Sequence, residues 1–374
     1  MADIRIFYDG TIFDGQKYGG ISRYFVELTR EMNSIDGCAA YVVAPFYDNA
    51  HLSELSARRE HIGKILGIRA KERRFTGKVR CIGNTVLTQL AVSVLHPTIF
   101  HKTYHSDDWP KLPRNTRRVT TIHDLIYEIL GDELPETEIL KARRQRDLET
   151  SDLVICVSEN TKKDLLKYYK LDEQKVTVVY HGSNGLAQSK GQARARFDRP
   201  YLLYVGKRGS YKNFITLALA WNNNRALRDN YALVCFGGGP FDETEYRTYR
   251  ELGVDLNEVR QVSGGDDTLA SLYENAEVFV YPSKLEGFGF PPLEAMSLAC
   301  PVICASSSCI PEVVGDAGLY FDPDSEEDLA TALLNLLEND AMKSELIEKG
   351  KQRLAEFTWK KCALDTLSAY RSTL

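Results

Sequence analysis

Two glutamates flank a Gly-Phe-Gly turn and a pair of prolines in the stretch SKLEGFGFPPLEAM, residues 283–296. The preceding run AEVFVYPS is apolar and β-branched, which predicts a buried strand that ends just before Glu286. Gly287 and Gly289 have no side chains, so a ligand can approach the backbone N–H groups between the two acids. The pattern predicts a ligand site at the carboxyl end of a strand, between Glu286 and Glu294.

A helix start follows this glycine turn. Pro291 and Pro292 suit the first turn of a helix through LEAMSLA, which places Glu294 inside that turn. Because a helix N-terminus attracts phosphate, carboxylates beside it need another use, and accepting hydrogen bonds from sugar hydroxyls is the natural one. In the alternative interpretation neither acid binds a ligand: Glu286 is a solvated loop residue, and Glu294 only stabilises the positive end of the helix dipole.

A basic glycine loop ends the first strand of the second half, in LYVGKRGSYKN. Arg208 offers a planar fork of donors and Lys212 a compact charge, which together suit a diphosphate. The loop lacks the Lys-Ser/Thr that closes a P-loop, which argues against a magnesium-dependent nucleotide hydrolase. A basic surface loop is the competing interpretation.

The first half holds a weaker set of signals. Gly19 and Gly20 in YGGISRY form a second glycine turn before a helix. His123 and Asp124 closely follow the strand VTTI, so the imidazole is expected to point toward the same ligand. A histidine with an ordinary core or loop role remains the alternative.

Two patterns imitate metal sites. His101 and His105 lie four residues apart in HKTYH, but the glutamate of a zinc protease helix is missing. Asp322 and Asp324 in FDPD precede a helix, where acids serve as caps. We therefore predict no metal site and assign the two aspartates to capping.

The composition is that of an ordinary soluble protein. The 374 residues are 43% hydrophobic and 26% charged, with a formal net charge of −5 that gives no sign of a nucleic-acid partner. The sequence shows no apolar leader and no run as long as a membrane span, so a cytoplasmic location is expected. Eight cysteines without a C-x-x-C pair are interpreted as reduced thiols.

Strand and helix patterns alternate along the whole chain, which predicts parallel sheets and an α/β fold. The alternation stops in SNGLAQSKGQARARFDRP, a polar stretch typical of a linker, and then restarts. Two similar domains facing across a cleft are the expected result. Their predicted bounds are 1–185 and 186–358, with a C-terminal helix at 359–374 that packs back on the first domain.

At this point a family resemblance becomes specific. Glu286 to Glu294 resembles the E-x7-E signature of retaining glycosyltransferases of family four, which have the GT-B architecture of two Rossmann-like, doubly wound domains. The likeness covers essentially the whole chain and is strong over 200–325, through YVGKRGSYKN, FGGGP, LYENAEVFVYPS, PVICASSSCIPEVVGDAG and DPDSEEDLA. YGGISRY and TIHDL are similar to members that transfer mannose in bacterial O-antigen or exopolysaccharide synthesis.

The resemblance implies a role for each matching residue. Arg208 and Lys212 would hold the diphosphate, Glu294 the ribose and Glu286 the donor sugar. His123 would contact that sugar from the first domain. The backbone N–H groups of Gly287, Phe288 and Gly289 would bind the sugar or the phosphates. Gly19 and Gly20 would lie next to the phosphates.

No role is carried over to Ser183 and Asn184, because the Asn-Gly-Val-Asp that many relatives have there is replaced by Ser-Asn.

The resemblance also implies the reaction. A retaining transfer of mannose from GDP-mannose is expected, to a glycan or a lipid-linked oligosaccharide, with no metal or other cofactor. Another nucleotide-sugar donor remains open. So do a sugar-nucleotide 2-epimerase of the same architecture and a catalytically silent binder.

A basic segment over residues 58–80 has no part in that scheme. Nine lysines and arginines there face only Glu60 and Glu72, and isoleucine, leucine and phenylalanine are interleaved among them. Such a segment is typical of contact with an anionic membrane surface, although a solvated basic face or an acceptor-phosphate site fits the same charges. The sequence therefore predicts a peripheral membrane association at the cytoplasmic side.

Overall fold

The computed structural model describes residues 4–15, 17, 19–52, 55, 60–65, 73–106, 109–131, 134–135, 137–189 and 197–374, without the side chains of 61–65 and 73–81. The chain divides into two compact units. Unit 1 comprises Met1–Gly182 and Trp359–Leu374, and unit 2 comprises Ser183–Thr358. This division lies three residues before the predicted boundary at 185 and 186.

Unit 1 is built on a seven-stranded sheet of order β3-β2-β1-β4-β5-β6-β7, in which every pair is parallel. The order reverses between β1 and β4, which is the switch point where ligands bind in such sheets. The strands are β1 (Ile4–Asp9), β2 (Cys38–Tyr47), β3 (His61–Ile65), β4 (Ile99–Lys102), β5 (Arg117–Ile122), β6 (Leu153–Cys156) and β7 (Val176–Val178).

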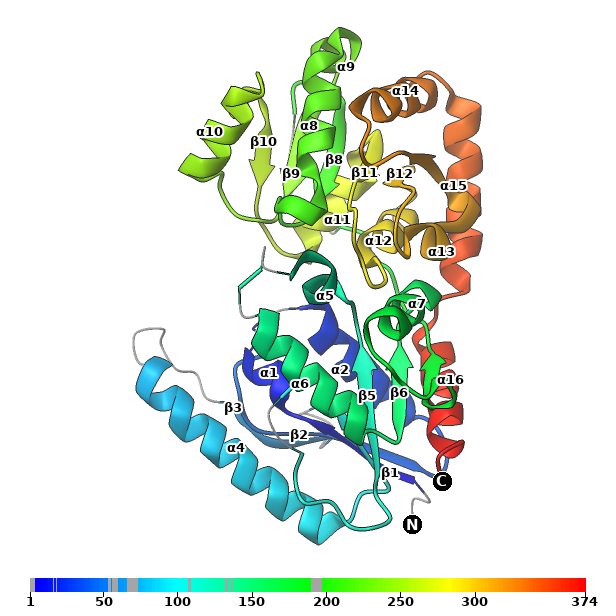
Figure 1. Ribbon diagram of the computed structural model, residues 1–374. Helices are drawn as coiled ribbons and strands as arrows, with labels where there is room; N and C mark the ends of the chain where they lie inside the picture. The colour runs from blue at the N-terminus through cyan, green and yellow to red at the C-terminus, as the bar shows by residue number, and fades with distance from the viewer. Residues whose placement is uncertain are drawn as a thin grey trace. The chain divides into compact units, whose positions relative to one another are not determined.

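Helices connect these parallel strands (Figure 1). They are α1 (Thr11–Gly15), α2 (Gly20–Met32), α4 (Arg73–Leu95), α5 (Ile126–Leu130), α6 (Thr137–Thr150), α7 (Glu159–Tyr168) and the C-terminal α16 (Trp359–Arg371), with a 3-10 turn η3 at Glu173–Lys175. The amphipathic period of α2 buries Tyr24, Phe25 and Leu28, and α16 packs against this helix. The chain therefore returns to unit 1 after unit 2.

Unit 2 has a six-stranded parallel sheet of order β10-β9-β8-β11-β12-β13. Its order reverses between β8 and β11, so the loops after these two strands meet at a switch point. The strands are β8 (Tyr201–Val205), β9 (Ala232–Phe236), β10 (Arg260–Val262), β11 (Val278–Tyr281), β12 (Val302–Ala305) and β13 (Gly318–Phe321).

The unit 2 strands are again separated by helices (Figure 1). They are α8 (Phe214–Asn223), α9 (Arg225–Asn230), α10 (Glu243–Glu251), α11 (Asp266–Asn275), α12 (Phe290–Ser297), α13 (Ile310–Val314), α14 (Glu326–Leu337) and α15 (Asp340–Ala355), with 3-10 turns η4 (Ser210–Lys212), η5 (Leu256–Glu258) and η6 (Gly315–Ala317). Two parallel-sheet α/β domains are thus confirmed. Within the described part of the chain, no helix has the length and apolar character needed to span a membrane.

Two local predictions are wrong. Ser325, not Asp322 or Asp324, caps α14, because its hydroxyl accepts a hydrogen bond from the Asp328 N–H at 3.1 Å. The Asp322 carboxylate instead accepts from the Asp324 N–H at 3.0 Å, and Asp324 pairs with Lys284. Glu294 lies just beyond the first turn of α12, because the helix begins at Phe290 and the two prolines are its second and third residues.

Candidate functional site

Lys212 and Glu286 meet at the switch point of unit 2. Lys212 ends η4 after β8, and Glu286 lies in the loop after β11, the neighbouring parallel strand. The two loops are joined by a hydrogen bond from the Lys284 N–H to the Tyr211 carbonyl, at 2.8 Å. The Lys212 Nζ lies 2.5 Å from the Glu286 Oε1. The structure therefore brings together one residue predicted to bind phosphate and the residue predicted to bind the donor sugar.

The backbone of Glu286 is held by Ser308, which sequence reasoning missed. The Ser308 hydroxyl donates to the Glu286 carbonyl at 2.7 Å and lies 3.2 Å from the Glu286 N–H. Ser308 has a φ of 55°, a left-handed conformation that is uncommon for serine. The Cys309 thiol adds contacts of 3.2 Å to the carbonyls of Glu286 and Phe288. The run of serines after β12 was the available signal, because that strand's carboxyl end lies beside β11.

The glycine turn leads into α12 as the sequence indicated. Gly289, at a φ of 99°, is the residue before the helix, a conformation that favours glycine. Phe288 is buried against Phe290 and Phe357, which fixes the turn between Gly287 and Gly289. Glu286 and Glu294 therefore lie on either side of a rigid turn whose backbone leads into a helix N-terminus.

Arg208 follows β8 as predicted, but its guanidinium is engaged by α10. Its Nε and Nη2 lie 2.7 and 3.1 Å from the two carboxylate oxygens of Glu245, and the group lies 4.3 Å above the Phe241 ring. Nη1 also donates to the Gly237 carbonyl at 3.1 Å, and the Arg208 side chain is only 3% exposed. A diphosphate would have to share or replace Glu245 in order to bind this guanidinium.

The predicted residues of unit 1 lie on α2 and after β5. Gly19 precedes α2, which begins at Gly20, and the Gly19 carbonyl accepts from the Ser22 hydroxyl. His123 follows β5, and its ring stacks on His181 with centroids 5.5 Å apart.

Both ring nitrogens of His123 are buried, and neither has a hydrogen-bond partner in the described part of the chain. Burial, with a smaller effect of His181, lowers the pKa of His123 well below its usual value, so the imidazole is neutral. A neutral imidazole can donate one hydrogen bond and accept another. A hydrogen-bonding ligand could therefore use both ring nitrogens of His123.

The histidines of HKTYH have separate structural roles. The ring of His101 is buried between the Tyr370 hydroxyl, at 2.7 Å, and the Thr121 hydroxyl, at 2.8 Å, and so ties α16 to β4 and β5. His105 lies 3.0 Å from an Asp147 carboxylate oxygen. The described residues contain no group of three or more histidines, cysteines or acids arranged to hold a metal ion.

His105 belongs to a buried ionic chain that the sequence did not reveal. Asp147 also accepts from the Lys102 Nζ at 2.7 Å, and the second nitrogen of His105 accepts from the Arg144 Nε at 3.0 Å. Arg144 in turn forms an ion pair with Glu128 on α5, the helix that begins three residues after His123. The chain thus ties the end of β4 to α5 and α6, and so braces the segment that follows His123.

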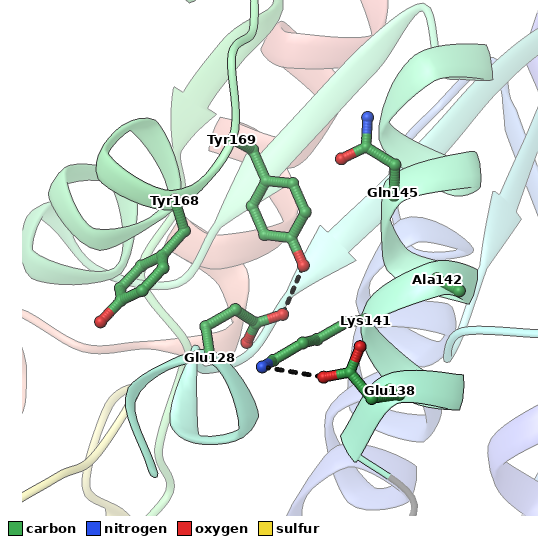
Figure 2. A pocket seen from close by; sticks show the side chains of 7 residues that line it. All are labelled: Glu128, Glu138, Lys141, Ala142, Gln145, Tyr168 and Tyr169. Atoms are coloured by element: carbon green, nitrogen blue, oxygen red, sulfur yellow. Dashed lines mark hydrogen bonds and ion pairs between the residues drawn. The ribbon is translucent and has the colours of Figure 1, made fainter. Parts of the chain in front are cut away.

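A surface pocket of about 410 Å³ lies beside the buried ionic chain and includes Glu128 in its lining (Figure 2). Figure 2 shows the Tyr169 hydroxyl directed at the Glu128 carboxylate, 2.5 Å away, and Lys141 paired with Glu138. Gln145, on the same wall, donates to Glu149 at 2.6 Å. The lining contains none of the predicted site residues and is Glu128, Glu138, Lys141, Ala142, Gln145, Tyr168 and Tyr169. Within this lining, Tyr169 donates to Glu128 and Lys141 pairs with Glu138.

Comparison with known proteins gives the family. The model described as glycosyl transferases group 1 matches residues 187–353, and the model of glycosyltransferase family 4 matches residues 18–184. O-antigen chain mannosyltransferase B of Escherichia coli is 28% identical over 280 residues, which are 72% of this chain and 74% of that protein. The O-antigen chain mannosyltransferase RfbU of Salmonella typhimurium is 28% identical over 232 residues, 60% of this chain and 62% of that one.

Solved structures share the fold. A sucrose-phosphate synthase from Thermosynechococcus elongatus superposes with a TM-score of 0.71 at 20% identity, over 99% of this chain and 98% of that one. Anabaena HepE, in complex with UDP, gives a TM-score of 0.68 at 15% identity, over 99% of this chain and 100% of that one. The two matched models together span most of both units, and the chain belongs to glycosyltransferase family four, with the GT-B fold.

Proposed function

We propose that this glycosyltransferase moves mannose from GDP-mannose, with retention of configuration, to a glycan or lipid-linked oligosaccharide of a bacterial surface polysaccharide. The observation that carries the donor site is the contact between Lys212 and Glu286 at the switch point of unit 2. The choice of mannose rests on the two similar proteins that are named O-antigen mannosyltransferases.

The donor roles follow from charge and position. Lys212 can neutralise a phosphate from the end of η4, and Arg208 can join it by exchanging one contact with Glu245. Glu286, fixed through its backbone by Ser308, would accept hydrogen bonds from the mannose hydroxyls. Glu294 would accept from the ribose, and the N–H groups of the turn from Gly287 to Gly289 would meet the phosphates.

The proposed chemistry is a front-face displacement. The bond from the anomeric carbon to the diphosphate oxygen breaks while the acceptor oxygen bonds to the same face, and the leaving diphosphate takes the acceptor proton. Positive charge develops on the sugar and negative charge on the phosphate, where Lys212 and Arg208 stabilise it. His123 is proposed to hydrogen-bond the mannose, because its ring nitrogens have no hydrogen-bond partner among the described residues.

We propose that no metal is needed, because two cationic side chains can offset the diphosphate charge. Transfer measured before and after EDTA treatment tests this point. Unchanged activity is expected, and complete inhibition that Mg²⁺ reverses would contradict it.

Product analysis tests the reaction itself. Proton NMR of the initial product should show an α-linked mannose, and a β-linked product would refute retention. Incubation with the donor alone separates the competing isomerase, because a 2-epimerase converts the sugar nucleotide without an acceptor. Conversion of that kind would overturn the proposal.

A further inference from the structure

The sequence predicts two groups of cations that bind anions. The cations of residues 58–80 lie outside the side chains that the structure describes, so their contact with a membrane stays a prediction. Arg208 is described in full, and its guanidinium is held by one segment of unit 2, from Gly237 to Glu245. The partners of this guanidinium show what a donor diphosphate has to replace.

Four of the five N–H groups of the Arg208 guanidinium donate within the protein. Nε donates to the Glu245 Oε1 at 2.7 Å, and Nη2 donates to the Glu245 Oε2 at 3.1 Å and to the Pro240 carbonyl at 3.3 Å. Nη1 donates to the Gly237 carbonyl at 3.1 Å. At most one N–H is then left for a ligand. Two phosphate oxygens can therefore bind Arg208 side by side only after some of these contacts are released.

Glu245 is the partner that a diphosphate replaces most directly. Its two carboxylate oxygens lie against one edge of the guanidinium, in the bidentate pairing that two phosphate oxygens also adopt. The Arg208 side chain is only 3% exposed, and a buried cation needs a counterion. Glu245 supplies this negative charge when no donor is bound, and a phosphate can supply it when a donor is bound. Because both anions need the same edge of Arg208, they compete for it.

Glu245 keeps a second set of contacts when it leaves Arg208. Its Oε2 accepts from the Asp242 N–H at 2.9 Å, and the Glu245 N–H donates to the Asp242 Oδ1 at 2.8 Å. These two bonds form a reciprocal capping box at the start of α10. The Glu245 side chain is 23% exposed, so water can solvate the oxygen that gives up the guanidinium. The release of Arg208 therefore leaves α10 capped.

The glycine run FGGGP, which ends β9, makes room for the guanidinium. A Cβ at Gly238 would lie only 2.7 Å from the Arg208 Nη1, and Gly238 has a φ of 69°, which favours glycine. The guanidinium also lies over the Phe241 ring, 4.3 Å from its centroid. The segment from β9 to α10 is therefore shaped around Arg208.

We propose that Glu245 competes with the diphosphate of the donor for Arg208 and so sets how tightly the enzyme holds a nucleoside diphosphate. The inference rests on the proposed function, in which Arg208 binds that diphosphate. Glu245 holds the guanidinium while the site is empty, gives it up to the donor, and returns to it after transfer. Because binding must first open the Arg208–Glu245 pair, the apparent affinity is lowered by the fraction of molecules in which the pair is open. Glu245 thus favours release of the nucleoside diphosphate product.

Calorimetric titration with GDP and with UDP tests the proposal, since both nucleotides carry the diphosphate. Glu245→Gln removes the charge that pairs with Arg208 and keeps the capping box, in which glutamine also serves. The substitution should lower the Kd about fivefold or more for whichever nucleotide binds the wild-type chain. In an Arg208→Met background it should change the Kd by less than about twofold, because no guanidinium is left to compete for.

A matched control lies at the start of α14. Asp328 is the third residue of its helix, as Glu245 is of α10, and its Oδ2 accepts from the Asp322 N–H at 2.7 Å. Asp328→Asn removes one negative charge from an equivalent helix position and leaves the Arg208 pair intact, so the Kd should not change. Thermal unfolding without nucleotide should show that both single variants are folded at the temperature of the titration.

The identity of the nucleotide and the role of Glu245 are decided separately. Binding of UDP but not of GDP would reject GDP-mannose as the donor, while the ratio of Kd values measured with UDP still tests Glu245. Equal Kd values for wild type and Glu245→Gln would overturn the proposal. Weaker binding by Glu245→Gln would also overturn it, because Glu245 would then position Arg208 for the donor. Equal tightening in the Arg208→Met background would show a general effect of charge and would overturn it as well.

Discussion

Replacing Lys212 by methionine removes the ammonium group and keeps most of the side-chain length. The Nζ lies 2.5 Å from the Glu286 Oε1, with the two side chains only 22% and 11% exposed, so the charge acts in a partly desolvated site. A hydrogen bond to a charged group contributes about 1.5–3 kcal/mol. Loss of such a contact to the diphosphate, together with looser positioning of Glu286, should raise the barrier by about 3 kcal/mol. That corresponds to roughly a hundredfold fall in kcat/KM, since about 1.4 kcal/mol is tenfold.

Steady-state transfer from GDP-mannose measures this fall, and Lys284→Met is the matched control. Lys284 forms an ion pair of the same 2.5 Å length with Asp324, but those side chains are 40% and 76% exposed. Exposed pairs contribute about 0–1 kcal/mol, so this variant should lose less than about fivefold. Equal kcat/KM in wild type and Lys212→Met, or equal losses in the two variants, would refute the assignment of Lys212 to the donor.

Glu286→Ala should abolish transfer in a folded protein, whereas Glu294→Ala should mainly raise the donor KM, because ribose contacts change little during reaction; equal losses of kcat with unchanged KM contradict this division. Asp147→Ala should lower the free energy of unfolding by about 3–5 kcal/mol in urea titrations, because it strands the buried Lys102; a change below about 1 kcal/mol would contradict the role of the ionic chain. Burial lowers the pKa of His101 to about 3, so the unfolded chain binds more protons between pH 6.5 and 3 and stability falls as pH falls through that window. His101→Gln should reduce this slope by up to about 1.4 kcal/mol per pH unit, and an unaltered slope argues against a buried neutral His101.

The central strands and the acidic signature were predictable because their signals are local. Runs such as LYVG at β8 and VFVY at β11 are apolar enough to identify buried parallel strands. The Gly-Phe-Gly turn and the two prolines then fix the start of α12 by backbone chemistry alone. The edge strands β10 and β13 escaped prediction, because RQV contains two polar residues and GLYF begins with glycine, so neither is an uninterrupted apolar, β-branched run.

The remaining site features depend on contacts between residues far apart in the sequence. Arg144 and Asp147 lie on α6 among other charged residues, and only folding shows that these two face the interior. The engagement of Arg208 by Glu245 joins residues 37 positions apart, so the sequence indicated a free cation after β8 where the structure has a paired one.

Calorimetric titration with sugar nucleotides tests the central claim most directly. GDP-mannose, UDP-glucose, an ADP-sugar and a dTDP-sugar would be compared on the wild-type chain and on Lys212→Met. The account predicts that GDP-mannose binds at least about tenfold more tightly than the others and that Lys212→Met weakens its binding. Tighter binding of UDP-glucose, or binding of GDP-mannose that Lys212→Met leaves unchanged, would contradict the account.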